Sequence, residues 1–288
     1  MSLRRRSLPR GWYPDEPETL RKLVSSWTVA SRAGVAGRAG VAGKGAGAVA
    51  AVAPHAGWSF SGRLAAEAAA SLERAPTVAI FGGHLPGGAR PLAARESGFE
   101  NPLGSLEADA ELLLALDARI DLGRDDEPDN TVEILLPIVA LLFPGSRVLW
   151  LRAPNDESSI ELGAALFDAA ASVGRRVACL GSTDLTHYGP NYSFVPKGRG
   201  VGAEAWVKGT NDKRFIDALL AMDGVEALAR AEADRSACSA GAAAAALAFA
   251  RAAGATRARL LDYSTSLEVR SDDSFVGYAA VAFYKEQA

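Results

Sequence analysis

The stretch RVLWLRAPNDESSIELGAALFDAAASVGRRVACL, residues 147–180, decides the fold class. Residues 147–151 and 176–180 are short apolar runs, which is typical of strands buried on both faces. Residues 158–173 lie between them and have a helical pattern. A strand, a helix and a second strand in this order predict a βαβ unit with parallel strands.

The same alternation extends in both directions along the chain. Residues 132–143 are apolar but contain Pro137, which predicts a helix with a kink or a break. We therefore predict one α/β domain over residues 1–288, with a mostly parallel central sheet and helices on both faces; the direction of the terminal strand stays open. Further strands are expected at 48–53, 77–81, 257–263 and 275–283, and further helices at 61–74, 106–116, 215–222, 225–231 and 240–252.

Residues 33–47 read AGVAGRAGVAGKGAG and form the one low-complexity stretch. Such a composition favours a flexible loop. A phosphate-binding loop is the alternative, but a Walker A motif needs Ser or Thr after its lysine, and Lys44 is followed by Gly45. The stretch also precedes its strand instead of following it, so we expect a loop.

Composition excludes several classes of function. The net charge is -3, which argues against a broad nucleic-acid surface, and we read the basic residues 4–6 as a solvated tail. No apolar run approaches the ~20 residues that span a bilayer, and the N-terminus does not resemble a secretory signal. Two cysteines, reduced in a cytosolic chain, are free for other roles. We expect a soluble cytoplasmic protein without nucleic-acid or membrane partners.

The three histidines of the chain each follow a predicted strand. His55 lies in PHAGWSFSG, His84 in GGHLPGG and His187 in STDLTHYG. Ligands of open α/β sheets bind beyond the carboxyl ends of the strands. A purely structural role would suit any one of these histidines, but three at strand ends indicate a common site.

A cysteine adds a softer ligand to this set. Cys238 stands at the start of the predicted helix 240–252, and a helix N-terminus favours the thiolate form that binds metals. Cys179 lies inside an apolar strand and is expected to be a buried hydrophobic residue. Two imidazoles and one thiolate would make an open site that favours iron, copper or zinc over magnesium or calcium.

Other polar residues suggest acid–base chemistry. Asp184 and His187 are three residues apart, so the aspartate could orient the imidazole as a general acid/base pair, or could instead cap a helix. Glu133 is a carboxylate in an apolar run and needs a partner, for which a ligand histidine is one candidate. Trp58, Phe60 and Tyr188 could form an apolar wall for an organic substrate, or simply pack in the core.

These motifs resemble the MEMO family, also called the AmmeMemoRadiSam system protein B family. The resemblance implies the fold of class III extradiol dioxygenases, which are non-haem iron enzymes. It implies metal ligation by His55, His84 and Cys238, with iron or copper as the metal, and a pocket shared with Asp184 and His187. The matching segments are WYPDEPETL, PHAGWSFSG, GGHLPGG, NTVEILLP, STDLTHYGP and LLDYSTSLEVRSDDSFVGY, in the family's order.

The chain departs from the family pattern in three places. Asn130 replaces a histidine of the usual EHSIEVQLP, Gly82-Gly83 replace Pro-Asn before His84, and the usual C-G is missing at Cys238. Three functions stay open: a metal-dependent oxidoreductase acting on a small organic substrate, a non-enzymatic protein that binds a ligand or peptide, and a metal-assisted hydrolase that uses zinc. A homo-oligomer is compatible with each.

Overall fold

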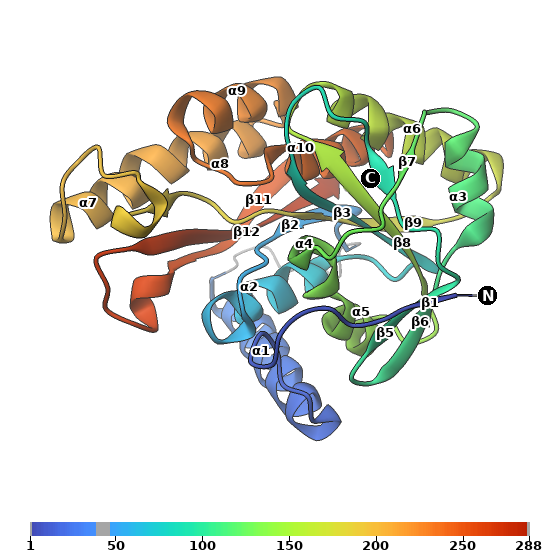
Figure 1. Ribbon diagram of the computed structural model, residues 1–288, viewed down its shortest axis with the longest axis horizontal. Coiled ribbons are helices and arrows are strands. Elements are labelled where there is room, and N and C mark those ends of the chain that lie inside the picture. The colour runs from blue at the N-terminus through green and yellow to red at the C-terminus, as the bar shows by residue number, and fades with distance from the viewer. Residues whose placement is uncertain (1, 39–46, 287–288) are drawn as a thin grey trace.

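A central mixed sheet separates two layers of helices (Figure 1). The computed structural model describes residues 2–38 and 47–286. Four parallel strands form the middle of the sheet in the order β2, β9, β3, β8, and they are buried over almost their whole length. Their bounds are β2 Ala50–Ala53, β3 Thr77–Leu85, β8 Arg147–Pro154 and β9 Val177–Ser182.

The outer strands make the sheet mixed. The long strand β12 runs antiparallel to its neighbours β2, β10 and β11, which settles the direction of the terminal strand. On the opposite side, β4 is antiparallel to β8 and parallel to β7. The parallel centre of the predicted sheet is confirmed. These strands are β4 Leu92–Ala93, β7 Gly123–Arg124, β10 His187–Tyr188, β11 Ala255–Thr265 and β12 Phe275–Lys285.

One helix layer packs on the sheet through α10, Ala240–Ala252, whose first eleven residues are all buried. Small side chains let this helix approach its neighbours closely: a Cβ at Gly163 would lie 2.1 Å from the carbonyl oxygen of Ala245. Alternate side chains of the strands point into this layer. The other helices of the layer are α3 Ala110–Asp117, α6 Ser158–Ser172, α8 Asp212–Leu220 and α9 Gly224–Asp234.

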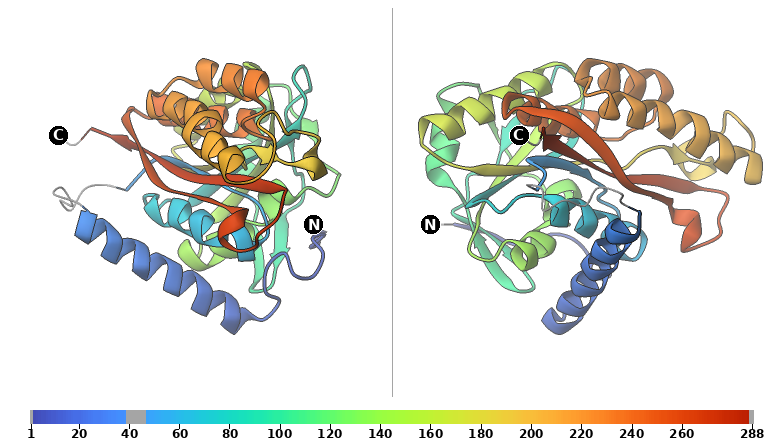
Figure 2. Two further views of the ribbon diagram at one scale, coloured as in Figure 1. Left: turned by 90° about the vertical axis from the view of Figure 1, so that its left-hand side faces the viewer. Right: turned by 180° about the vertical axis from the view of Figure 1, so that it is seen from behind.

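The opposite face is covered by α2, Trp58–Ser71, with α1, Pro17–Arg38, lying outside it (Figure 2). The layer also contains α4 Asn130–Glu133 and α5 Leu136–Leu142. Beside these layers lie a three-stranded sheet of β1 Leu3–Arg4, β5 Gly98–Asn101 and β6 Gly104–Glu107, the helix α7 Val201–Trp206, a π-helical turn Val207–Asn211, and 3-10 turns Pro190–Tyr192 and Ser266–Glu268.

Several sequence predictions need correction. The expected loop at 33–47 begins too early, because α1 continues to Arg38 in spite of Gly34 and Gly37; residues 39–46 lie outside the described residues. Residues 106–107 belong to β6, and the helix predicted there begins at Ala110 after its N-cap Asp109. The break at Pro137 is confirmed, since α5 begins one residue earlier.

Two of the three basic N-terminal residues are not solvated: Arg4 and Arg6 are half-buried, and only Arg5 is exposed. Arg4 donates to the carbonyl oxygens of Asp125 and Glu127, and its guanidinium lies over the Trp150 ring at 4.3 Å. A cation over an aromatic face is stabilising. The N-terminal segment is therefore part of the fold. Among the described helices, none is long and apolar enough to cross a membrane.

Candidate metal centre

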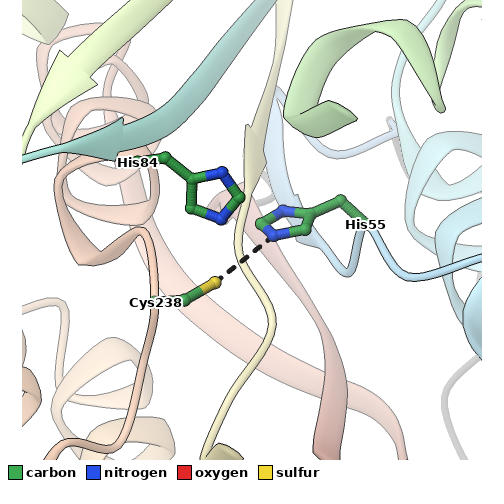
Figure 3. A group of neighbouring side chains, drawn as sticks. All are labelled: His55, His84 and Cys238. Atoms are coloured by element: carbon green, nitrogen blue, oxygen red, sulfur yellow. Dashed lines mark hydrogen bonds between the residues drawn. The ribbon is translucent and has the colours of Figure 1, made fainter. Parts of the chain in front are cut away.

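Three segments meet at the carboxyl ends of the parallel strands. His55 follows β2, His84 lies at the end of β3, and Cys238 precedes α10. Because β9 alone separates β2 from β3, the two histidines are brought together, with ring centroids 5.1 Å apart. Figure 3 shows both rings and the sulfur pointing toward one another. One ligand atom from each residue lies within 4.8 Å of the other two, so the three could hold a metal ion.

His84 does not follow its strand, as the sequence suggested, but lies within it. The pairing of β3 with β8 shifts register between Gly82 and Leu85, and His84 has a φ of 58°. A residue other than glycine adopts this conformation only where its surroundings hold it, and such strain is common at functional sites. The bulge turns the His84 ring toward His55 instead of leaving it in the strand's regular alternation.

Each imidazole is oriented through its Nδ1 atom. The Nδ1 of His55 lies 3.0 Å from the hydroxyl of Ser182, and the Nδ1 of His84 lies 3.2 Å from a carboxylate oxygen of Asp129. These contacts leave both Nε2 atoms for a ligand, as in metal sites whose histidines are held by an outer hydrogen bond. The donor set of two nitrogens and one sulfur therefore fits a soft or borderline first-row metal.

The charges at the site favour a thiolate beside two protonated imidazoles, so a metal would have to displace the imidazole protons in order to bind. Burial alone would raise the pKa of Cys238, but His55 and His84 lower it well below the ordinary value, which favours the thiolate. Asp129 and Cys238 raise the pKa of His84 to about 10. Burial lowers the pKa of His55, yet Asp184 and Cys238 outweigh it and leave that pKa raised. The Cys238 sulfur lies 3.3 Å from the Nε2 of His55. Its negative charge would attract a metal cation to the position between the sulfur and the two imidazole rings.

Asp184 and His187 both line the cavity beside the three donors, but the carboxylate of Asp184 is hydrogen-bonded to His55 and not to His187. Its carboxylate accepts a hydrogen bond from the main-chain N–H of His55 at 2.7 Å. The His187 ring packs edge-on against Tyr192 with centroids 4.9 Å apart. Burial raises the pKa of Asp184, while His55 and His187 oppose that effect. The role of the two residues as an acid–base pair stays a prediction.

Glu133 is the clearest error among the predicted site residues. Its carboxylate accepts hydrogen bonds from the main-chain N–H groups of Ser7 and Leu8 and from the Tyr13 hydroxyl, so it anchors the N-terminal segment and not a ligand histidine. Asp129 holds His84 instead. The sequence marked Asp129 only as an N-cap candidate for the helix that begins at Asn130, and no local signal indicated its contact with His84.

The remaining predicted residues divide into two groups. Asn130 supports the site, since its side-chain amide donates to the carbonyl oxygen of His55 at 3.2 Å. Trp58 and Tyr188 do not line the cavity; both are buried, Trp58 against Tyr13 and Tyr188 stacked on Phe275. Large aromatic side chains contribute most when packed in this way, so their role is in the core.

The site opens into a cavity of about 700 Å³. This volume is within the range of small-molecule sites. Polar and apolar groups share the wall, and Phe60 is the one member of the predicted apolar wall that reaches it. Other lining residues are Trp12, Ser59, Asn191, Tyr192, Ser266, Arg270, Val276 and Tyr278.

The fold and the site together define the class of this protein. It is an α/β domain in which two histidines and a cysteine that could hold a metal ion meet at the carboxyl ends of the parallel strands. The Memo-like protein family model matches residues 4–282, and the chain belongs to this family. A MEMO1 family protein of Methanosarcina barkeri is 34% identical over 242 residues, covering 80% of this chain and 84% of the relative. Another from Pyrococcus furiosus is 30% identical over 300 residues, covering 98% and 99%. Membership is consistent with the extradiol dioxygenase-like fold.

Proposed function

We propose that this protein is a metal-dependent oxidoreductase that acts on a small organic substrate, with iron or copper held by His55, His84 and Cys238. The observation that carries the proposal is that two of the three donors, His55 and His84, line a cavity of about 700 Å³, with the Cys238 sulfur beside them. A closed structural site would surround its ion with four protein ligands, whereas an open site leaves a position for substrate.

The bound metal would supply redox and Lewis-acid chemistry at this position. The protein residues would bind and orient the substrate and move protons. His187 is the group suited to proton transfer, because it lines the cavity without being part of the three-residue donor set. Phe60 and Tyr192 would bind the apolar part of an organic substrate. Asp184 would hold the main chain of His55 and place negative charge beside His55 and His187.

Metal analysis of the native protein and of its His84→Ala variant tests the first part of the proposal. We expect near-stoichiometric iron or copper in the wild type and little in the variant. Oxygen uptake with a panel of catechols after anaerobic reconstitution with Fe²⁺ tests the second part. His187→Ala should retain the metal and lose the uptake. A protein that takes up no first-row metal, or an His84→Ala variant that binds it equally well, would overturn the proposal.

A further inference from the structure

Arg152 is a buried cation at the edge of the metal centre. Its side chain starts on β8, opposite Gly82 of β3, and is 8% exposed. The Nε–H donates to the carbonyl oxygen of Gly83 at 2.9 Å, and Nη2 lies 3.4 Å from the Asp129 carboxylate. Arg152 therefore contacts two of the groups that place His84: the residue before it in the chain and the carboxylate beside its ring.

We propose that Arg152 is a positioning residue for the metal centre, which fixes the His84 imidazole through Asp129 and the Gly83 main chain. This inference rests on the metal site proposed above. Arg152 is neither a lining residue of the cavity nor one of the three donors, so it would act on the metal only through the position of His84. Burying an arginine costs desolvation free energy. The fixed position that Arg152 gives to Asp129 and to the Gly83 main chain explains why a charged residue stands there.

The bulge in β3 explains why this arginine is needed. Regular β3–β8 pairing ends at Gly82 and resumes at Leu85, so Gly83 and His84 have no paired residue on β8. A buried carbonyl needs a donor, and the Arg152 guanidinium donates to that of Gly83 at this irregular point of the strand. The same group thereby stabilises the left-handed backbone of His84.

Asp129 is held on two sides. One carboxylate oxygen accepts from the N–H of Thr131 at 2.9 Å, and the other lies between His84 and Arg152. The carboxylate is therefore held in place to accept a hydrogen bond from the Nδ1–H of His84, which orients the ring.

The Arg152 guanidinium is itself held by a second carboxylate, that of Asp125. Its Nη1 lies 3.3 Å from Asp125, whose carboxylate also accepts from the Trp150 indole N–H at 2.8 Å. Arg4, from the N-terminal segment, lies 3.7 Å from the same carboxylate. A planar guanidinium can reach Asp125, Asp129 and Gly83 at once, whereas a lysine ammonium is a point charge that cannot keep all three directions.

Arg152→Lys is the test variant, because it keeps the buried charge and allows folding. Co²⁺ serves as the probe, with its affinity measured by chelator competition and its thiolate charge-transfer and d–d absorption recorded. We expect the Co²⁺ Kd to rise about ten-fold and the d–d spectrum to change. Arg95→Lys is the matched control, since Arg95 also bridges a carboxylate, Asp117, and a carbonyl, but away from the site. It should leave both readouts unchanged.

A double-mutant cycle separates positioning from a general loss of stability. In an Asp129→Asn background, Arg152→Lys should lose more than half of its effect on the Co²⁺ Kd, because the two residues act on His84 together. Full additivity, or wild-type affinity and spectrum in Arg152→Lys, would overturn the inference while leaving the proposed metal site intact. A wild type that shows no thiolate–Co²⁺ absorption would instead remove the metal site, and this inference with it.

Discussion

Asp212 allows a quantitative test, because it is a carboxylate buried beneath the segment that carries Asp184 and His187. It accepts hydrogen bonds from the main-chain N–H of Thr186 at 3.0 Å, from the hydroxyl of Thr186, and from the Tyr263 hydroxyl at 2.8 Å. Among the residues described, no cation lies within ion-pair distance of it. Burial raises the pKa of Asp212 from 3.8 to about 6, although the hydrogen bonds oppose the shift.

The sign of the effect on stability follows from proton linkage. Between the unfolded and the folded pKa, the native state binds more protons than the unfolded state, so the free energy of unfolding falls as the pH rises. The shift of about two pKa units corresponds to about 3 kcal/mol. This cost is absent below about pH 4 and complete above about pH 7. Asp212→Asn removes it, so the variant should gain about 3 kcal/mol relative to the wild type over that range.

Urea unfolding followed by circular dichroism at several pH values measures the difference between the two proteins. A constant offset from altered hydrogen bonding cancels, since only the pH dependence counts. Tyr263→Phe is the matched control: it keeps the carboxylate but removes a hydrogen bond that lowers its pKa, so the midpoint should move to higher pH. Parallel stability curves for the wild type and Asp212→Asn would refute the reasoning.

Three further predictions concern packing and the metal centre. Gly163→Ala should destabilise the fold by about 1–3 kcal/mol in urea unfolding, because its Cβ would overlap an α10 carbonyl, whereas Gly202→Ala, with open space around it, should not. Asn130→Ala should weaken Co²⁺ binding several-fold in chelator competition by freeing the His55 carbonyl; an unchanged Kd would contradict this. Co²⁺ at 100 times its Kd should stabilise the wild type by about 2.7 kcal/mol in thermal unfolding, and Cys238→Ala at the same concentration by far less.

Local patterns along the chain were enough to predict the main layers of the fold. Apolar runs of strand length alternating with helical patterns can bury their side chains in only a few ways, so the α/β class and the parallel centre of the sheet were predictable. The rare histidines and Cys238 also marked the region of the site, because strand ends gather at one edge of such a sheet. Signals of this kind are local, or follow from topology alone.

Tertiary structure decided which polar groups meet. Asp129 and Glu133 are four residues apart in one polar-to-apolar segment, yet the first contacts His84 and the second contacts Ser7, 126 positions away in the chain. The bulge that turns His84 toward His55 depends on Arg152 of a neighbouring strand, and no local pattern encodes it. A hydrogen bond acts over about 3 Å, so its partner is fixed only after long-range packing has brought the two groups together.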